Sequence, residues 1–179
     1  MALHAITRAN ESAPRKNLRH RIEHASVLNN ELIRQMKEAG VVASVQPHFI
    51  ISDVWLEQRL GAQRASHAYP FHTLVQSGLI LVGGSDCPVE PITPLSGIEA
   101  AVNRAGNEAV TVEEAISFYT RNAAYASSEE NMKGTITPGK RADLVIVDKD
   151  PRRVPASRLS EIQILLTIVG GKFAYEAKS

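Results

Sequence analysis

The chain contains 179 residues, of which 44% are hydrophobic and 22% charged, and its formal net charge is +1. This length allows one domain, or one domain with a small appendage, of ordinary globular composition. The nearly balanced charge excludes the basic footprint of a nucleic-acid-binding protein, and the single cysteine excludes a disulfide framework or a cysteine-built zinc site. No apolar stretch reaches the roughly 20 residues that span a bilayer, and the chain opens without a signal-peptide pattern. We therefore expect a cytoplasmic protein without membrane or nucleic-acid partners.

Segments typical of strands alternate with segments typical of helices in the first part of the chain. Helical periodicity covers residues 1–12 and 27–39, while apolar runs at residues 18–25, 41–45 and 79–83 are typical of strands. This alternation predicts an α/β fold whose strands form a parallel sheet with right-handed crossovers.

The connections and later helices follow the same order. Residues 46–68 form a long connection, and loops longer than about 12–15 residues are usually functional. A short helix is expected at residues 70–76, and another at residues 95–104. The sequence Thr111-Val-Glu-Glu114 is a capping box, which predicts a helix running to residue 126.

The last part of the chain has a different pattern. Residues 133–148 read as a turn followed by a strand. Residues 162–169 and 172–175, joined by Gly170 and Gly171, read as a β-hairpin. We therefore expect a boundary near residue 130, with one unit over residues 1–130 and a second over residues 131–179.

Asp86 is the first candidate for chemistry. It follows the run Leu-Ile-Leu-Val-Gly-Gly-Ser of residues 79–85. An ionised carboxylate at the end of a buried strand costs on the order of several kcal/mol if it stays unpaired. A cation, a metal, backbone N–H groups or water must therefore compensate it. Asp86 is a candidate metal ligand and general base, with a turn or N-cap aspartate as the alternative.

His24 is the second candidate, because it ends another strand-like segment. A neutral imidazole there could bind a metal, and the alternative is a hydrogen-bonded structural histidine. His20 is expected to be structural, because each strand residue advances about 3.3 Å and both rings could not reach one ion. Parallel strands place their carboxyl ends at one edge of the sheet. His24 and Asp86 are therefore expected to lie close enough to bind the same ion.

Two further side chains are candidates for substrate binding. His48 follows Pro47 at the end of the second strand, where it could line a cleft. Arg64 lies in the long connection and could bind an anionic group of a substrate, with a solvated surface arginine as the alternative.

Three motifs in series carry a family resemblance. They are Arg-His-Arg-Ile-Glu-His-Ala at residues 19–25, Gly-Gly-Ser-Asp-Cys-Pro-Val at residues 83–89, and Thr-Pro-Gly-Lys-Arg-Ala-Asp-Leu-Val-Ile-Val-Asp at residues 137–148. Together they resemble the metal-dependent amidohydrolase superfamily, in the branch that includes the N-substituted formamide deformylases. The resemblance covers almost the whole chain.

The resemblance implies a (β/α) TIM-type barrel with one or two divalent metals at its carboxyl-end face, flanked by a small β-sandwich. By resemblance, His24 corresponds to the metal-binding histidine of the sixth strand and Asp86 to the aspartate of the eighth. The implied role of Asp86 is to deprotonate a metal-bound water and to pass the proton to the leaving nitrogen. Zinc is the first candidate metal, with iron or manganese as alternatives, and the implied substrate is a small amide-type molecule.

The chain departs from the family pattern in one respect: it contains no H-x-H metal pair. Catalytic zinc typically has three protein ligands and a water, whereas this chain offers two candidates. We therefore expect a C-terminal portion, with a partial barrel of about strands six to eight and part of the sandwich. Such a fragment need not retain its metal or be active on its own.

Three functional hypotheses remain open. The first is a metal-dependent hydrolase of non-peptide carbon–nitrogen bonds, of which this chain is a fragment. The second is a catalytically incomplete module that oligomerises or complements a separate N-terminal half. The third is an unrelated small α/β binding domain. Unpaired sheet edges and apolar surface predict a homo-oligomer or the missing half as the partner.

Overall fold

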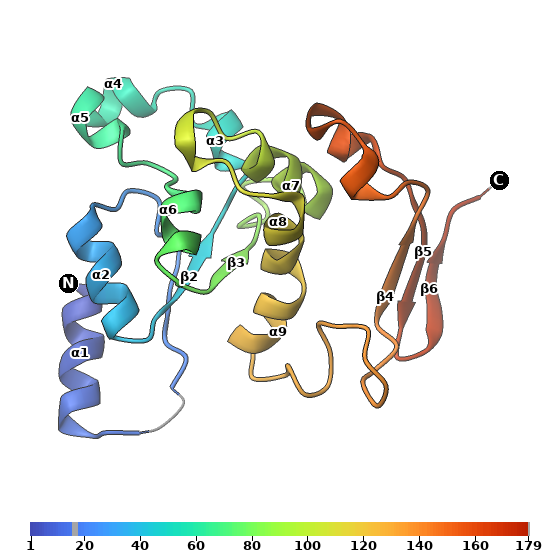
Figure 1. The fold of residues 1–179 in the computed structure, drawn as a ribbon, viewed down its shortest axis with the longest axis horizontal. Coiled ribbons are helices and arrows are strands. Elements are labelled where there is room, and N and C mark those ends of the chain that lie inside the picture. Colours follow the sequence, from blue (N-terminus) through green and yellow to red (C-terminus); the bar gives the residue numbers. More distant parts are fainter. Residues whose placement is uncertain (16–17, 179) are drawn as a thin grey trace.

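The computed structural model describes residues 1–15 and 18–178. The chain forms a mixed α/β structure with two small sheets (Figure 1). The strands are β1 (Arg21–Ile22), β2 (Val42–Val45), β3 (Leu81–Gly83), β4 (Leu144–Val147), β5 (Ile164–Val169) and β6 (Lys172–Glu176). The α-helices are α1 (Ala2–Ser12), α2 (Asn30–Glu38), α3 (Phe49–Ser52), α4 (Leu56–Leu60), α5 (Ala62–Ala65), α6 (Phe71–Gln76), α7 (Pro94–Val102), α8 (Val112–Tyr119) and α9 (Arg121–Ala126). Short 3-10 helices are η1 (Gly106–Glu108), η2 (Pro151–Arg153) and η3 (Ala156–Glu161).

The first sheet is parallel, as the sequence predicts, with the order β1-β2-β3. Its central strand is buried on both faces along its whole length, which is typical of a parallel sheet covered by helices. Figure 1 shows α1 and α2 on one side of this sheet and α7, α8 and α9 on the other. The largest fully buried side chains come from this sheet and from helices α2, α6 and α8, and include Met36, Phe71, Leu74, Leu81 and Phe118.

The second sheet is antiparallel, with the order β4-β5-β6, and it stands apart from the first (Figure 1). Its hairpin turns at Gly170 and Gly171, both at positive φ, as predicted from the sequence. Phe173 and Tyr175 on β6 are 70% and 51% exposed. Leu159 in η3 and Ile162, by contrast, are buried in the same core cluster as the first sheet.

Two predicted elements end or break where the sequence predicts them to continue. The strand expected over residues 18–25 pairs only at Arg21–Ile22, because His24 and Ala25 have positive φ values of 69° and 35° that break the extended backbone. The helix expected to reach residue 126 is broken at Thr120, whose φ and ψ of −125° and −101° are not helical. Pro14 and Asn17 also favour a turn in the sequence, but residues 16 and 17 lie outside the described part of the chain.

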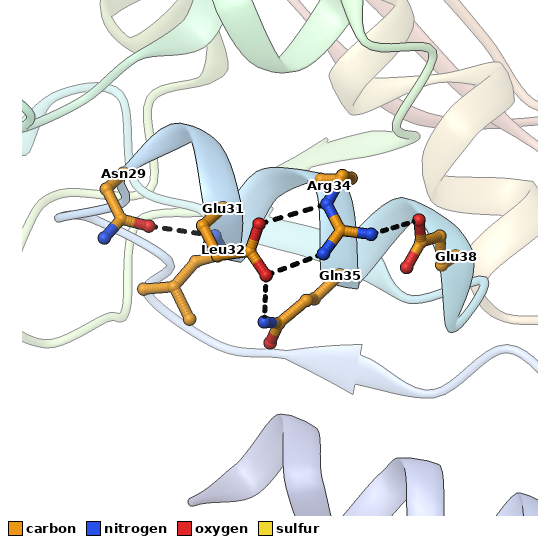
Figure 2. Close-up of polar contacts among 6 residues, drawn as sticks. All are labelled: Asn29, Glu31, Leu32, Arg34, Gln35 and Glu38. Carbon is orange, nitrogen blue, oxygen red and sulfur yellow. Dashed lines mark hydrogen bonds and ion pairs between the residues drawn. The ribbon is translucent and has the colours of Figure 1, made fainter.

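The helix expected from residue 27 begins at Asn30, since the Asn29 side chain caps it by accepting a hydrogen bond from the Leu32 amide at 2.9 Å (Figure 2). Val27 instead pairs with Ala68 in an isolated bridge. The long connection that ends at Ala68 contains the short helices α3, α4 and α5. Arg104 also holds the end of this connection, because its Nη2 donates a hydrogen bond to the Ala68 carbonyl at 3.0 Å.

Among the described residues, no helix has both the length and the apolar character needed to cross a bilayer.

Candidate active site at the carboxyl edge of the parallel sheet

The ends of β1, β2 and β3 place the candidate residues along one edge of the parallel sheet. His24 follows β1, His48 follows β2, and Asp86 follows β3. The Gly84 amide donates to the Val45 carbonyl at 3.0 Å, so β2 and β3 stay paired up to this edge. Parallel α/β folds carry their ligand and catalytic sites at such an edge.

His24 is held in one orientation by a buried amide. Its Nδ1 lies 3.0 Å from Oε1 of Gln46, a residue only 5% exposed. An amide oxygen can only accept a hydrogen bond, so Nδ1 is the donor, and in the neutral ring Nε2 keeps its lone pair. The ring also stacks on Phe49, with centroids 6.4 Å apart. Metal-binding histidines are oriented in this way by an acceptor on the other ring nitrogen.

Asp86 lies in the turn after β3 and has a positive φ of 54°. Its carbonyl accepts a hydrogen bond from the Val89 amide at 2.9 Å. Asp86 is exposed, so contact with solvent compensates the negative charge of its carboxylate. The carboxylate therefore remains available to a reactant that approaches the edge from solvent.

His48 is paired with a carboxylate that the sequence gave no reason to single out. Its Nδ1 lies 2.7 Å from Oε2 of Glu90, whose side chain is only 9% exposed. The Ser52 hydroxyl, and then the His48 ring, hold the pKa of Glu90 below its usual range, although burial opposes this. Glu90 lies among prolines in the loop after β3, and no periodic pattern marks it as buried.

Two hollows open at this edge. The first, the His24 cavity, has a volume of about 290 Å³ and is lined by His24, Ser26, Val27, Phe49, Asp53, Leu56, Arg59, Leu60 and Tyr69. The second, the His48 cavity, has a volume of about 200 Å³ and is lined by His48, Gly83, Gly84, Ser85, Pro91, Ile92, Thr93, Pro94, Gly97 and Tyr119. The structure thus assigns the two histidines to different hollows, and Asp86 lines neither.

Arg64 also lies outside both cavities. It is exposed on α5, and its Nε donates to the Leu60 carbonyl at 2.8 Å. The arginine that lines the His24 cavity is Arg59 on α4.

Each cavity contains a tyrosine that the sequence did not mark. The Tyr69 hydroxyl donates to Oδ2 of Asp53 at 2.9 Å, and burial, followed by this carboxylate, raises the pKa of Tyr69. Burial also raises the pKa of Tyr119. Both hydroxyls therefore stay protonated and act as hydrogen-bond donors.

The described residues do not by themselves complete a catalytic metal site. Over residues 1–15 and 18–178, no group of three or more His, Cys, Asp or Glu side chains is arranged to hold one ion. Catalytic zinc typically needs three protein ligands. The oriented His24 ring fits one of these positions, and the others would have to come from elsewhere.

Comparison with known proteins agrees with this geometry. The chain matches the Amidohydrolase family over residues 1–175. It is 36% identical to the amidohydrolase YtcJ of Bacillus subtilis, over 98% of this chain and 36% of that protein. It is also 32% identical to the N-substituted formamide deformylase of Arthrobacter pascens, over 87% of this chain and 31% of that protein. The chain thus spans about a third of the length of these relatives.

Solved structures of metal-dependent hydrolases share its fold. One from Pyrococcus furiosus has a TM-score of 0.74 and 38% identity, covering 85% of this chain and 32% of that one. An adenosine deaminase from Xanthomonas campestris with bound zinc has a TM-score of 0.65 at 20% identity, which is a likeness of fold alone. The three sequence motifs, the parallel sheet with its polar edge and these matches lead to one conclusion: the chain belongs to the amidohydrolase family.

Proposed function

We propose that this chain forms part of the active site of a metal-dependent hydrolase that cleaves non-peptide carbon–nitrogen bonds. The observation that carries the proposal is the His24 ring, which the buried Gln46 orients with Nε2 unprotonated at the carboxyl edge of the sheet. Zinc is the proposed ion, with iron or manganese as alternatives. The ligands that the described residues do not supply come from a segment outside this chain.

The finer architecture belongs to the same proposal. We take β1, β2 and β3 as about the sixth to eighth strands of a TIM-type barrel, which further strands beside β1 and β3 would continue. Residues 131–179 are then part of a flanking β-sandwich, and residues 1–130 part of the barrel. The parallel order β1-β2-β3 and the antiparallel order β4-β5-β6 support this division.

Asp86 is the proposed general base. Its exposed carboxylate takes a proton from the attacking water and returns it to the leaving nitrogen, a role worth about 10²–10⁴-fold in rate. The substrate is a small amide-type molecule, as the name of the Arthrobacter relative suggests. The His24 cavity, with its apolar wall of Phe49, Leu56 and Leu60, receives the substituent of that amide.

A chimera tests this function. This chain would replace the matched segment of the Arthrobacter deformylase, and formate release and zinc content would be measured. We expect Asp86→Asn to reduce kcat by about 10²-fold or more. His24→Ala should reduce zinc content, because it removes one ligand. Glu11→Gln on α1, an exposed carboxyl-to-amide change far from the edge, serves as the control.

Two results would contradict the proposal. Full hydrolysis in the Asp86→Asn chimera would exclude the aspartate as the general base. Undiminished zinc in the His24→Ala chimera would exclude the histidine as a ligand. Zinc titration of the 179-residue chain also tests the role of His24 without a chimera. We expect weak zinc binding to the unmodified chain and none to the His24→Ala variant.

A further inference from the structure

His48 repeats the arrangement of His24 at the next strand end. Each ring presents Nδ1 to an oxygen of a buried side chain, Gln46 for His24 at 3.0 Å and Glu90 for His48 at 2.7 Å. Gln46 and Glu90 are 5% and 8% exposed, and both belong to the small set of buried polar residues in the described chain. Burying a carboxylate is unfavourable unless it is paired, so Glu90 is held in place for its contact with His48.

The Glu90 contact fixes which nitrogen of His48 carries the proton. An ionised carboxylate can only accept a hydrogen bond, so Nδ1 is the donor, and in the neutral ring Nε2 keeps its lone pair. Nδ1 contacts the buried carboxylate, and His48 lines the His48 cavity. In the neutral ring, Nε2 is then the nitrogen that can accept a hydrogen bond from a group that enters the cavity.

The same cavity also contains hydrogen-bond donors. Tyr119 and Ser85, which both carry a hydroxyl group, line it together with His48. Its volume of about 200 Å³ is below the roughly 300–1,000 Å³ of pockets that take whole drug-sized ligands. A small group with one N–H donor and one carbonyl acceptor matches both the polar groups and the size.

The metal-ligand alternative for His48 is not supported. Within the described part of the chain, His48 and Glu90 form no group with a third His, Cys, Asp or Glu that could hold an ion. Asp86, the metal candidate closest in the sequence to Glu90, does not line the cavity.

We infer that Glu90 is a positioning residue that sets His48 Nε2 as a hydrogen-bond acceptor, and that the His48 cavity binds the N–H of a small primary or secondary amide. The inference rests on the proposed function for its place in the reaction, because the cavity would hold the amide end of the substrate beside the edge that carries Asp86. It requires no covalent step by His48.

The tautomer can be measured directly on the 179-residue chain. Nitrogen-15 NMR of the histidine rings, at a pH high enough for them to be neutral, should show His48 with a protonated Nδ1 and an unprotonated Nε2. A His48→Gln variant assigns the signals. Glu90→Met, which keeps a side chain of similar length but removes the oxygen that accepts from Nδ1, should shift His48 towards the Nε2–H form while His24 in the same spectrum stays unchanged.

Amide binding is tested with two matched probes. N-methylformamide has an N–H and N,N-dimethylformamide has none, so only the first should shift the His48 Nε2 signal in a titration. Loss of one neutral hydrogen bond weakens binding by about twofold to tenfold, and we expect Glu90→Met to weaken the N-methylformamide response by that factor. His48→Gln should abolish the response in the neighbouring Tyr119 and Ser85 signals.

Three results would overturn the inference: an Nε2–H tautomer in the unmodified chain, an unchanged tautomer in a folded Glu90→Met variant, or equal responses to the two probes. These readouts need neither metal nor turnover. A chimera without hydrolysis but with the expected tautomer and probe selectivity would therefore reject the hydrolase proposal while leaving the amide site intact.

Discussion

Tyr119 lies in a slot that two glycines leave open. A Cβ at Gly97 would lie 2.0 Å from the Tyr119 Oη, and a Cβ at Gly83 would lie 2.5 Å from its Cζ. Both glycines are therefore needed for close approach of the ring, and the slot forms one wall of the His48 cavity.

We predict that Gly97→Ala and Gly83→Ala each destabilise the chain by about 1–3 kcal/mol, the usual cost of overpacking. Tyr119→Phe should recover most of the loss for Gly97→Ala, because the closest overlap there is with the hydroxyl. Tyr119→Phe should not recover the stability lost in Gly83→Ala, because the added Cβ there overlaps ring carbons that phenylalanine also has. Urea denaturation of the single and double variants measures these differences. Equal recovery in both backgrounds would show that the hydroxyl is not the obstacle.

Arg19 joins the segment before β1 to the end of α9. Its guanidinium donates to both carboxylate oxygens of Glu130 and lies 3.8 Å above the ring of Tyr125. The hydrogen bond from Arg19, reinforced by its charge, lowers the pKa of Glu130 from 4.5 to about 2. A depressed carboxyl pKa stabilises the folded state above the unfolded pKa, and this contribution is lost as the pH falls.

We therefore expect Glu130→Gln to lower the thermal midpoint at neutral pH and to differ progressively less from the unmodified chain between pH 4.5 and about 2. Thermal unfolding followed by circular dichroism across this range measures the effect. Glu11→Gln should track the unmodified chain at every pH. If the difference in thermal midpoint persisted near pH 2, the contact with Arg19 would not be the source of the stability that Glu130 contributes.

For single residues, the sequence indicated which side chains could be functional but not which residues they would contact. His24, His48 and Asp86 could be chosen because each follows a strand-like run. Glu90 could not, because nothing in a proline-rich loop shows that a carboxylate will be buried against a histidine 42 positions away. Tyr119 was missed because its partners are two glycines, whose missing side chains leave no trace in a hydrophobic pattern.

Helix α2 has two kinds of local stabilisation, a side-chain cap at its start and ion pairs along its surface (Figure 2). At its start, the Asn29 side chain caps the Leu32 amide at 2.9 Å. Along its surface, Arg34 contacts Glu31 and Glu38, and all three side chains are more than half exposed. Exposed ion pairs contribute little and are screened by salt, whereas a lost cap leaves a backbone donor unsatisfied.

We predict that Asn29→Ala lowers the free energy of unfolding by about 1 kcal/mol, independently of salt. Arg34→Ala should cost less, and its effect should vanish in about 1 M NaCl, where the Debye length is about 3 Å. Denaturant titrations at low and high salt measure both. If Arg34→Ala lowered the free energy of unfolding more than Asn29→Ala, the surface ion pairs would stabilise α2 more than the cap does.

Elements with a local chemical signal could be predicted, and those decided by distant contacts could not. The capping box of Thr111 and Glu114 forms as expected, with both reciprocal hydrogen bonds present. The Gly170-Gly171 turn also forms. The early end of β1 at Ile22 and the break at Thr120 depend instead on packing that apolar periodicity does not report.

On the scale of the whole molecule, the second sheet exposes several apolar side chains. Val145, Ile146, Val169, Phe173 and Tyr175 are between 42% and 70% exposed. Exposed apolar side chains gathered on one small sheet favour association, and β6 is an edge strand with no partner among the described residues on its outer side.

We expect the 179-residue chain to bind a hydrophobic dye and to sediment as a concentration-dependent mixture of monomer and oligomer. Phe173→Lys should reduce both signals, because it places a charge on the edge strand. Val54→Lys, a change at an equally exposed apolar residue (69%) away from this sheet, should leave both unchanged. A monodisperse monomer without dye binding would contradict the expectation.

The connection between β2 and α6 is fastened at both ends by residues outside it. His24 and Glu90 hold its beginning through Gln46 and His48, while Val27 and Arg104 hold its end at Ala68. Helix α3 shares in this attachment, because Phe49 stacks on the His24 ring and the Ser52 hydroxyl bonds to Glu90. Exchanging the stretch that follows, residues 54–66, would reshape the wall of the His24 cavity while these anchors keep their partners.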